Sequence, residues 1–363
     1  MKEKFYSSVK ATDQHDADLR KLLSETPLQG TLRVTMESEP SFFSGDHDIV
    51  KHDAVLVSHQ QTPVACGSRL LRRVNWNGKE QHVAYLAHLR LHPSWQKRGG
   101  RALIEGYRMI ETFAHHSPAV ATWTAIFRSN SDAQSTLMGQ RAGLPNYVAR
   151  GKLHSALILI KRRHCWPHHC ARAKAEDMPA ITRFLQQELC HRPLAPMIHG
   201  DDLTSGQRWP DLRPEDFVML KKNDEIIGVT AVRDLRNDKQ VRVTQLPLLW
   251  KLARLPSIFF AACHLCTPIP QQGAVLALGY ASFFTVKEDD PSTAKILMRA
   301  ATVVAAEKKL SFLSVAFHEN DPKRQAIDSL RAIKTDGDLY QVIYHGDVDS
   351  WPEQTPYIDP ANL

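Results

Sequence analysis

The chain has 363 residues, of which 43% are hydrophobic, and its formal net charge is +7 at pH 7. This length predicts two domains of ordinary size, and the basic charge favours anionic ligands without choosing between a coenzyme and a nucleic acid. The apolar runs are too short for a membrane span, the amino-terminal residues do not have the pattern of a secretory signal, and the six cysteines are scattered, so we expect a cytoplasmic protein.

The first half of the chain predicts a mixed α/β fold. Apolar and β-branched runs predict strands at residues 31–36, 54–57, 65–74, 81–91, 119–127 and 152–160. Asn77-Gly78 predicts a tight hairpin between the third and fourth of these strands. Helical periodicity predicts helices at 13–23 and 101–115, and a third that begins near Asn130 or Ser131, either of which can cap it. This order predicts a largely antiparallel sheet with crossover helices.

A basic loop between a predicted strand and a predicted helix is the most informative segment. It reads Leu89-Arg-Leu-His-Pro-Ser-Trp-Gln-Lys-Arg-Gly-Gly-Arg-Ala102. Such a loop leaves backbone amides unpaired at the positive end of a helix dipole, which suits a pyrophosphate. Lys97, Arg98 and Arg101 add positive charge, and a bulky residue at Gly100 would block the ligand. The alternative is a plain turn that uses glycine for its conformational freedom; neither the dinucleotide nor the nucleoside-triphosphate glycine motif occurs.

The second half of the chain repeats the order of the first. Residues 216–232 echo 53–70, residues 315–320 echo 124–130, and residues 293–309 stand where the first half has 101–115. The join falls in the charged, proline-interrupted segment 161–170. In place of the basic loop the second copy has Lys287-Glu-Asp-Asp-Pro-Ser-Thr293, whose carboxylates would repel a pyrophosphate. We therefore expect one such site, in the N-terminal half.

The loop and the repeat together resemble tandem GNAT-type N-acyltransferases, which use acetyl-CoA or another acyl-CoA. The resemblance is carried by Leu89–Pro93, by Lys97-x-x-Gly100-x-Ala102 and by Asn130-x-x-Ala133. It implies an α/β (α+β) fold of two tandem GNAT-like domains, each a mixed, mostly antiparallel twisted sheet flanked by helices. The expected boundaries are 1–163 for the domain with the acyl-CoA site, 164–350 for a degenerate GNAT-like domain and 351–363 for a tail.

The resemblance also implies where the coenzyme binds. The strands 83–91 and 119–127 would diverge, and the pantetheine arm would pair with the backbone of Leu89 and Leu91. The implied binding residues are Leu89, Arg90, Leu91, Lys97, Arg98, Gly99, Gly100, Arg101, Ala102, Asn130 and Ala133. The chain departs from the family where a tyrosine is usual after the Asn, since Leu137-Met-Gly139 occupies that place and Ser135 and Tyr147 are the nearby hydroxyl groups.

Acyl transfer to an amine needs a base and an oxyanion donor but no covalent intermediate. His88 is the candidate base, because it precedes Leu89 and has an ordinary pKa near neutrality. Tyr85 would line the same pocket. The alternatives are that His88 is an ordinary strand residue hydrogen-bonded to a neighbour and that Tyr85 is a core residue. One role for Arg90 is to bind an acidic substrate. We expect instead that its side chain is a charge on the strand that is exposed to solvent.

Cysteine and histidine are grouped in two places. Cys165 and Cys170 lie with His164, His168 and His169, and a second group is Cys263-His264-x-Cys266. A zinc site is the alternative interpretation of these residues. We expect structural cysteines and no metal, because the spacing from Cys165 to Cys170 is long for a zinc knuckle.

Two further segments are predicted to be structural. Residues 246–260 are apolar with Lys251 and Arg254 inserted, which suits a helix that meets a membrane or an acyl chain, but we expect a core or interdomain helix. The basic runs 69–73 and 161–163 are expected to be solvated faces, so no DNA partner is predicted.

The sequence therefore predicts an acyl-CoA-dependent N-acyltransferase, with acetyl-CoA as the leading donor and a small-molecule amine or peptide as acceptor. Two alternatives stay open: a catalytically silent acyl-CoA-binding scaffold, and a transferase with another donor such as aminoacyl-tRNA or long-chain acyl-CoA. A homodimer is also left open.

Overall fold

The computed structural model describes residues 6–30, 32–44, 48–96, 99–139, 142–161, 165–262, 268–328, 330–347 and 349–363. The first half contains β1 (Tyr6–Ala11), α1 (Asp16–Glu25), β2 (Arg33–Glu37), β3 (Ile49–His59), β4 (Thr62–Trp76), β5 (Lys79–Leu91), α2 (Gly100–His115), β6 (Ala119–Phe127), α3 (Ser131–Leu137) and β7 (Asn146–Leu159). The second contains β8 (Cys170–Arg172), α4 (Met178–Leu189), β9 (Phe217–Lys222), β10 (Glu225–Arg233), β11 (Gln240–Gln245), α5 (Leu248–Ala262), β12 (Leu278–Val286), α6 (Pro291–Glu307), β13 (Phe312–His318), β14 (Ala332–Lys334) and β15 (Gly337–Ile343).

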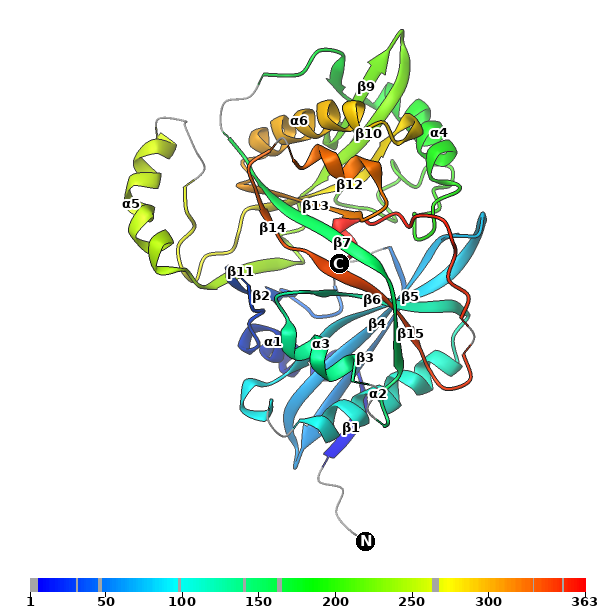
Figure 1. Ribbon diagram of the computed structural model, residues 1–363, viewed down its shortest axis with the longest axis vertical. Helices are drawn as coiled ribbons and strands as arrows, with labels where there is room; N and C mark the ends of the chain where they lie inside the picture. Colours follow the sequence, from blue (N-terminus) through cyan, green and yellow to red (C-terminus); the bar gives the residue numbers. More distant parts are fainter. Residues whose placement is uncertain are drawn as a thin grey trace.

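One twisted sheet of 13 strands runs through both halves (Figure 1). The strand order is β1-β3-β4-β5-β6-β15-β7-β13-β12-β10-β9-β8, with β14 beside β7. Only β5–β6 and β12–β13 are parallel among the pairs described, so the mixed, mostly antiparallel sheet is confirmed. No described helix is both long enough and apolar enough to cross a bilayer.

The two halves exchange their last strands. β15 comes from the end of the chain but lies between β6 and β7, with Gly337 opposite Phe127 on one side and opposite Leu153 on the other. β7 in turn pairs with β13 of the second half through residues 153–159. Each half is therefore completed by a strand of the other, and a cut between the two halves would separate strands that are hydrogen-bonded to each other.

Helices cover both faces of the sheet in each half. In the first half, α2 packs Ala102, Tyr107 and Ile110 on one face, and α1 packs a leucine stripe on the other. In the second half, α6 and α4 occupy the corresponding faces. The apolar residues recur at helical spacing, so each helix buries one side against the sheet.

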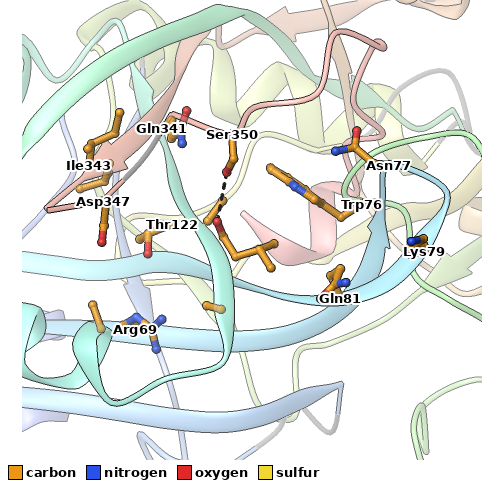
Figure 2. A pocket seen from close by; sticks show the side chains of 15 residues that line it. Arg69, Trp76, Asn77, Lys79, Gln81, Thr122, Gln341, Ile343, Asp347 and Ser350 are labelled. Atoms are coloured by element: carbon orange, nitrogen blue, oxygen red, sulfur yellow. Dashed lines mark hydrogen bonds between the residues drawn. The ribbon is translucent and has the colours of Figure 1, made fainter.

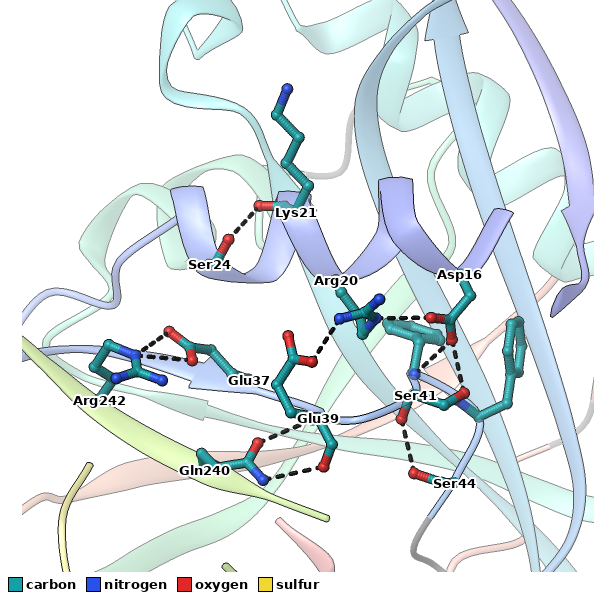
Figure 3. A network of polar contacts seen from close by, with 12 residues as sticks. Asp16, Arg20, Lys21, Ser24, Glu37, Glu39, Ser41, Ser44, Gln240 and Arg242 are labelled. Carbon is teal, nitrogen blue, oxygen red and sulfur yellow. Dashed lines mark hydrogen bonds and ion pairs between the residues drawn. The ribbon is translucent and has the colours of Figure 1, made fainter. Parts of the chain in front are cut away.

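A two-stranded sheet of β2 and β11 adds a second connection between the halves (Figure 3). Arg242 Nε lies 3.0 Å and 3.1 Å from the two carboxylate oxygens of Glu37. The Gln240 side chain hydrogen-bonds to both the backbone amide and the backbone carbonyl of Glu39. Residues more than 200 positions apart are thus held in register.

Two expectations from the sequence are wrong. The basic run 69–73 is not a solvated face, because Arg69 is 1% exposed beside Asp53, and Arg72 and Arg208 flank the buried Asp48. Of the core or interdomain helix expected at 246–260, the core placement is wrong, because the leucines of α5 are exposed. In both cases the tertiary contacts, rather than the local pattern, decide the burial.

Substitution of Gly337 tests the strand exchange. An ideal Cβ at this position would lie 2.8 Å from the Ile126 carbonyl oxygen and 3.1 Å from the Phe127 Cα. We expect Gly337→Ala to lower the free energy of unfolding by about 1–3 kcal/mol, because backbone atoms of β6 must shift. Urea unfolding followed by fluorescence measures this change, and Gly100→Ala, whose Cβ meets no atom within 4 Å, is the control. Equal stability of the two variants would contradict the placement of β15.

Candidate functional site

The parallel strands β5 and β6 pair over part of their length and then diverge. Pairing runs from His82 and Ala119 to Tyr85 and Trp123, and no later pair is found within the described residues of the two strands. At the narrow end of the split, Thr124 Oγ1 donates a hydrogen bond to the Leu86 carbonyl, 2.9 Å away. Beyond it, no described strand pairs with the edge of β5 that faces β6, and an extended ligand can bind to such an edge.

A β-bulge lies in β5 just beyond this point. Cys66 of β4 pairs with Arg90 and Ser68 pairs with Ala87, so His88 and Leu89 together face one residue, Gly67. His88 has a φ of 54°, a conformation that costs a non-glycine residue on the order of 1 kcal/mol. A bulge bends its strand and redirects the side chains. The bulge therefore fixes both the divergence of β5 and the position of His88.

His88 belongs to a chain of polar contacts on the face of the sheet that α1 covers. Its Nδ1 lies 3.2 Å from Ser68 Oγ, which lies 2.9 Å from His52 Nε2. One hydroxyl proton cannot serve both contacts, so one of the two imidazoles must donate an N–H to Ser68. The Phe42 ring covers His88 at 5.0 Å between centroids. Ser68 and His52 were not predictable as neighbours of His88, because only the strand register brings them together.

The surroundings keep His88 neutral. Burial lowers the pKa of His88 well below its ordinary value, and the nearby His52 and Arg90 lower it further. Arg90 is half-buried, not solvated as expected, and its Nη1 donates to the Leu89 carbonyl at 2.9 Å. Lys239, from the second half, also lowers the pKa of His88 and donates to the main-chain oxygen of Leu363 at 2.6 Å. No local pattern in the sequence indicates this contribution by Lys239.

Tyr85 lies where β5 and β6 separate. Its ring packs on Trp123 at 4.6 Å between centroids, and the backbone amide of Ala125 hydrogen-bonds to its hydroxyl. Burial raises the pKa of Tyr85 to about 12, so the hydroxyl stays protonated near neutrality. The side chain is thus part of the core and also lies at the narrow end of the split.

The loop after β5 ends at the N-terminus of α2, and no side chain caps that N-terminus. An ideal Cβ on Gly99 would lie 2.3 Å from Leu91 Cδ2 and 2.9 Å from the Trp95 carbonyl oxygen, whereas Gly100 has open space before it. Arg101 is exposed and Ala102 is buried, while Lys97 and Arg98 lie outside the described residues. Gly99 is therefore required by packing, and Gly100 leaves room at the helix end.

Asn130 and Ala133 lie at the start of α3. Asn130 Oδ1 accepts a hydrogen bond from the Ala133 amide at 3.3 Å, so Asn130 is the cap of this helix. Of the two nearby hydroxyl groups, Ser135 is exposed, and Tyr147 contacts the hydroxyl of Tyr107. Burial raises the pKa of Tyr147 well above its ordinary value.

The second half has the same backbone features with different residues. β12 and β13 pair from Leu278 to Tyr280, and β12 then bulges opposite Thr230. The bulged residue with positive φ is Phe283, at 54°, where β5 has His88. Phe283 is 1% exposed and packs on Trp209. The bulge is thus repeated, but the second copy places an apolar core side chain there.

The chain itself fills the second split. Residues 357–363, part of the expected tail, pack on β12 and β13, and Ser282 Oγ donates to Asp359 Oδ1 at 2.8 Å. The N-terminus of α6 is capped by Asp290, whose Oδ2 accepts from the Thr293 amide at 2.7 Å. At the second split, over the residues that the structure describes, the edge of β12 is therefore covered and the N-terminus of α6 is capped.

A cavity of about 600 Å³ lies at the other end of β6, away from the split (Figure 2). It is lined by the first residues of β6, by β15 and by the buried Arg69. This cavity is distinct from the diverging ends of β5 and β6, and none of the residues expected in the site lies in it.

The expected cysteine and histidine groups are only partly described. Cys165, Cys170, His168 and His169 are described, and His164, Cys263, His264 and Cys266 are not. No group of three or more potential metal ligands is found in the described part of the chain.

No protein-family model and no curated protein sequence matches the chain. Among solved structures, a GCN5-related N-acetyltransferase from Sphaerobacter thermophilus is similar over 97% of this chain and 100% of that chain, with 15% identity and a TM-score of 0.56. The N-myristoyltransferase of Saccharomyces cerevisiae with bound myristoyl-CoA is similar over 93% of this chain and 83% of that chain, with 10% identity and a TM-score of 0.57. The chain therefore has the GNAT-like fold of these proteins, as the sequence predicted.

The neutral state of His88 predicts a pH dependence of stability. A histidine whose pKa is lower in the folded state destabilises the fold as pH falls, because the unfolded chain binds a proton that the folded chain does not. Between about pH 6.5 and about pH 5.5, the wild type should lose about 1 kcal/mol more unfolding free energy than His88→Asn, since Asn tolerates positive φ and does not titrate there. Urea unfolding at both pH values measures the difference, and an identical loss in both proteins would contradict the assignment.

Proposed function

We propose that the chain is an acyl-CoA-dependent N-acyltransferase with one coenzyme site, in its N-terminal half. The observation that carries the proposal is the divergence of β5 and β6 beside the uncapped N-terminus of α2. An open strand edge suits the amide groups of a pantetheine arm, and free helix amides suit a pyrophosphate. The two solved structures with this fold are named as acyltransferases, which supports the same activity here.

The residues present fit acyl-CoA. Leu89, Arg90 and Leu91 lie on the unpaired edge of β5, and the amides from Gly99 to Ala102 begin α2. Lys97 and Arg98 precede these amides in the sequence and add positive charge. Asn130 keeps its amide nitrogen as a donor, because only its Oδ1 is used in the α3 cap.

Acyl-CoA supplies the acyl group as a thioester, whose carbonyl carbon an amine can attack. His88 is neutral, which is the form that accepts the amine proton, and Ser68 and His52 fix its orientation. Tyr85 stays protonated and keeps a hydroxyl donor at the narrow end of the split. A backbone amide of the bulged β5 is the candidate oxyanion donor.

The second half contributes to the acceptor side in this proposal. Lys239, in the second half, lowers the pKa of His88, and residues 357–363 fill the second split. The acceptor would then enter between the halves, as a small-molecule amine or the free amino group of a peptide. Acetyl-CoA is the leading donor, and the chain divides into 1–163 with the site, 164–350 as the degenerate partner and 351–363 as a tail, of which residues 357–363 fill the second split.

The coenzyme site is tested with Gly100→Glu. The protein leaves space for the new side chain, but its carboxylate would stand where the pyrophosphate binds. We expect the Kd for coenzyme A, measured by calorimetry, to rise about tenfold or more. The matched control is Ser292→Glu at the N-terminus of α6, which should bind coenzyme A like the wild type. A larger effect of the control, or no binding by the wild type, would overturn the assignment.

The catalytic role of His88 is tested with His88→Asn. Loss of a general base should lower kcat about a hundredfold or more while leaving coenzyme A binding within about twofold. The assay is thiol release from acetyl-CoA and longer acyl-CoAs with a panel of amines and peptides. Binding without turnover by the wild type across the panel would favour a silent acyl-CoA scaffold, and salt-dependent tRNA binding would favour an aminoacyl-tRNA donor.

A further inference from the structure

Helix α5 exposes a stripe of large leucines away from the site described above. Leu248, Leu249, Leu252 and Leu255 are 72%, 77%, 68% and 75% exposed. At about 100° per residue, Leu248, Leu252 and Leu255 fall within about 60° of one another around the helix axis. Figure 1 shows α5 standing out from the body of the molecule. An exposed apolar stripe of this kind marks an interaction surface.

The opposite side of the helix is attached to the protein. Trp250 packs against the apolar cluster around Tyr280, and Ser257 is buried. Ser257 Oγ donates to the Arg254 carbonyl at 2.6 Å and accepts from the Ile269 amide at 3.1 Å. The leucines therefore face outward because the other side of α5 is fixed, and the stripe is not the result of a loose helix.

The segment that carries the stripe has cations and no carboxylate. No Asp or Glu occurs from Lys239 to Lys287, and Lys251 and Arg254 lie on α5 itself, whereas Arg242 of β11 is paired with Glu37. Lys251 is exposed on the edge of the leucine stripe. A leucine face bordered by cations is the composition of helices that lie at an anionic lipid surface.

We propose that α5 is a peripheral membrane contact that inserts its leucine stripe into an anionic lipid bilayer. The helix has 15 residues, so its length is about 22 Å, shorter than the hydrocarbon core of about 30 Å, and it lies in the interface. A second copy of the chain fits the stripe less well, because two α5 helices would bring their cations together with no carboxylate of this segment to pair with them. The proposal is independent of acyl transfer.

The test is sedimentation of the full chain with vesicles of phosphatidylcholine alone or mixed with phosphatidylglycerol. The wild type should bind the mixed vesicles more tightly than the neutral ones. Leu252→Ser/Leu255→Ser should lower the bound-to-free ratio about tenfold or more on mixed vesicles, and Lys251→Glu should remove most of the preference for them. The matched control is Val9→Ser/Val50→Ser, which removes two exposed apolar side chains elsewhere and should bind like the wild type.

Two outcomes would overturn the proposal. One is equal vesicle binding by the wild type and the leucine variant, or no binding by either. The other is a wild-type dimer in light scattering that the leucine variant converts to a monomer without any vesicle binding, since a second copy would then cover the stripe. Thermal unfolding of each variant shows that it is folded. Calorimetry with coenzyme A on the same samples measures separately whether coenzyme A binds at the split between β5 and β6.

Discussion

The bulge in β5 at His88 is the constraint on which the proposed site depends. Two residues of β5 face Gly67, so the strand turns away from β6 beyond Tyr85 and leaves an edge without a neighbouring strand. A sheet that continued its pairing to Leu91 would have no such edge and no access to the end of α2. The local cost of positive φ at His88 is offset by burial of its ring under Phe42 and by its contact with Ser68.

The second half repeats the backbone of the proposed site with different residues in it. It repeats the bulge with Phe283, caps its helix with Asp290 and fills its split with residues 357–363. The same fold therefore supports an open half and a closed half, and the difference lies in a few side chains and one segment. The exchange of β7 and β15 fixes the two halves to each other, which lets Lys239 act on His88 across the boundary.

Local signals in the sequence predicted much of the fold and the position of the loop. The Asn77-Gly78 hairpin is confirmed by positive φ at both residues, and the helix after the basic loop begins at Gly100, one residue earlier than expected. The exchange of strands was not predictable, because β6 and β15 are separated by about half of the chain and no local pattern specifies their pairing. The burial of Arg69 and the exposure of the α5 leucines also depend on which elements lie nearby.

In the proposed function, coenzyme A binds along β5 and at the start of α2, in one half only. Hydrogen–deuterium exchange of the full chain with and without coenzyme A tests it most directly. We expect slower exchange in peptides that cover residues 87–91 and 99–103, and no change in those that cover 283–295. Protection of the second region instead, or of neither, would contradict it.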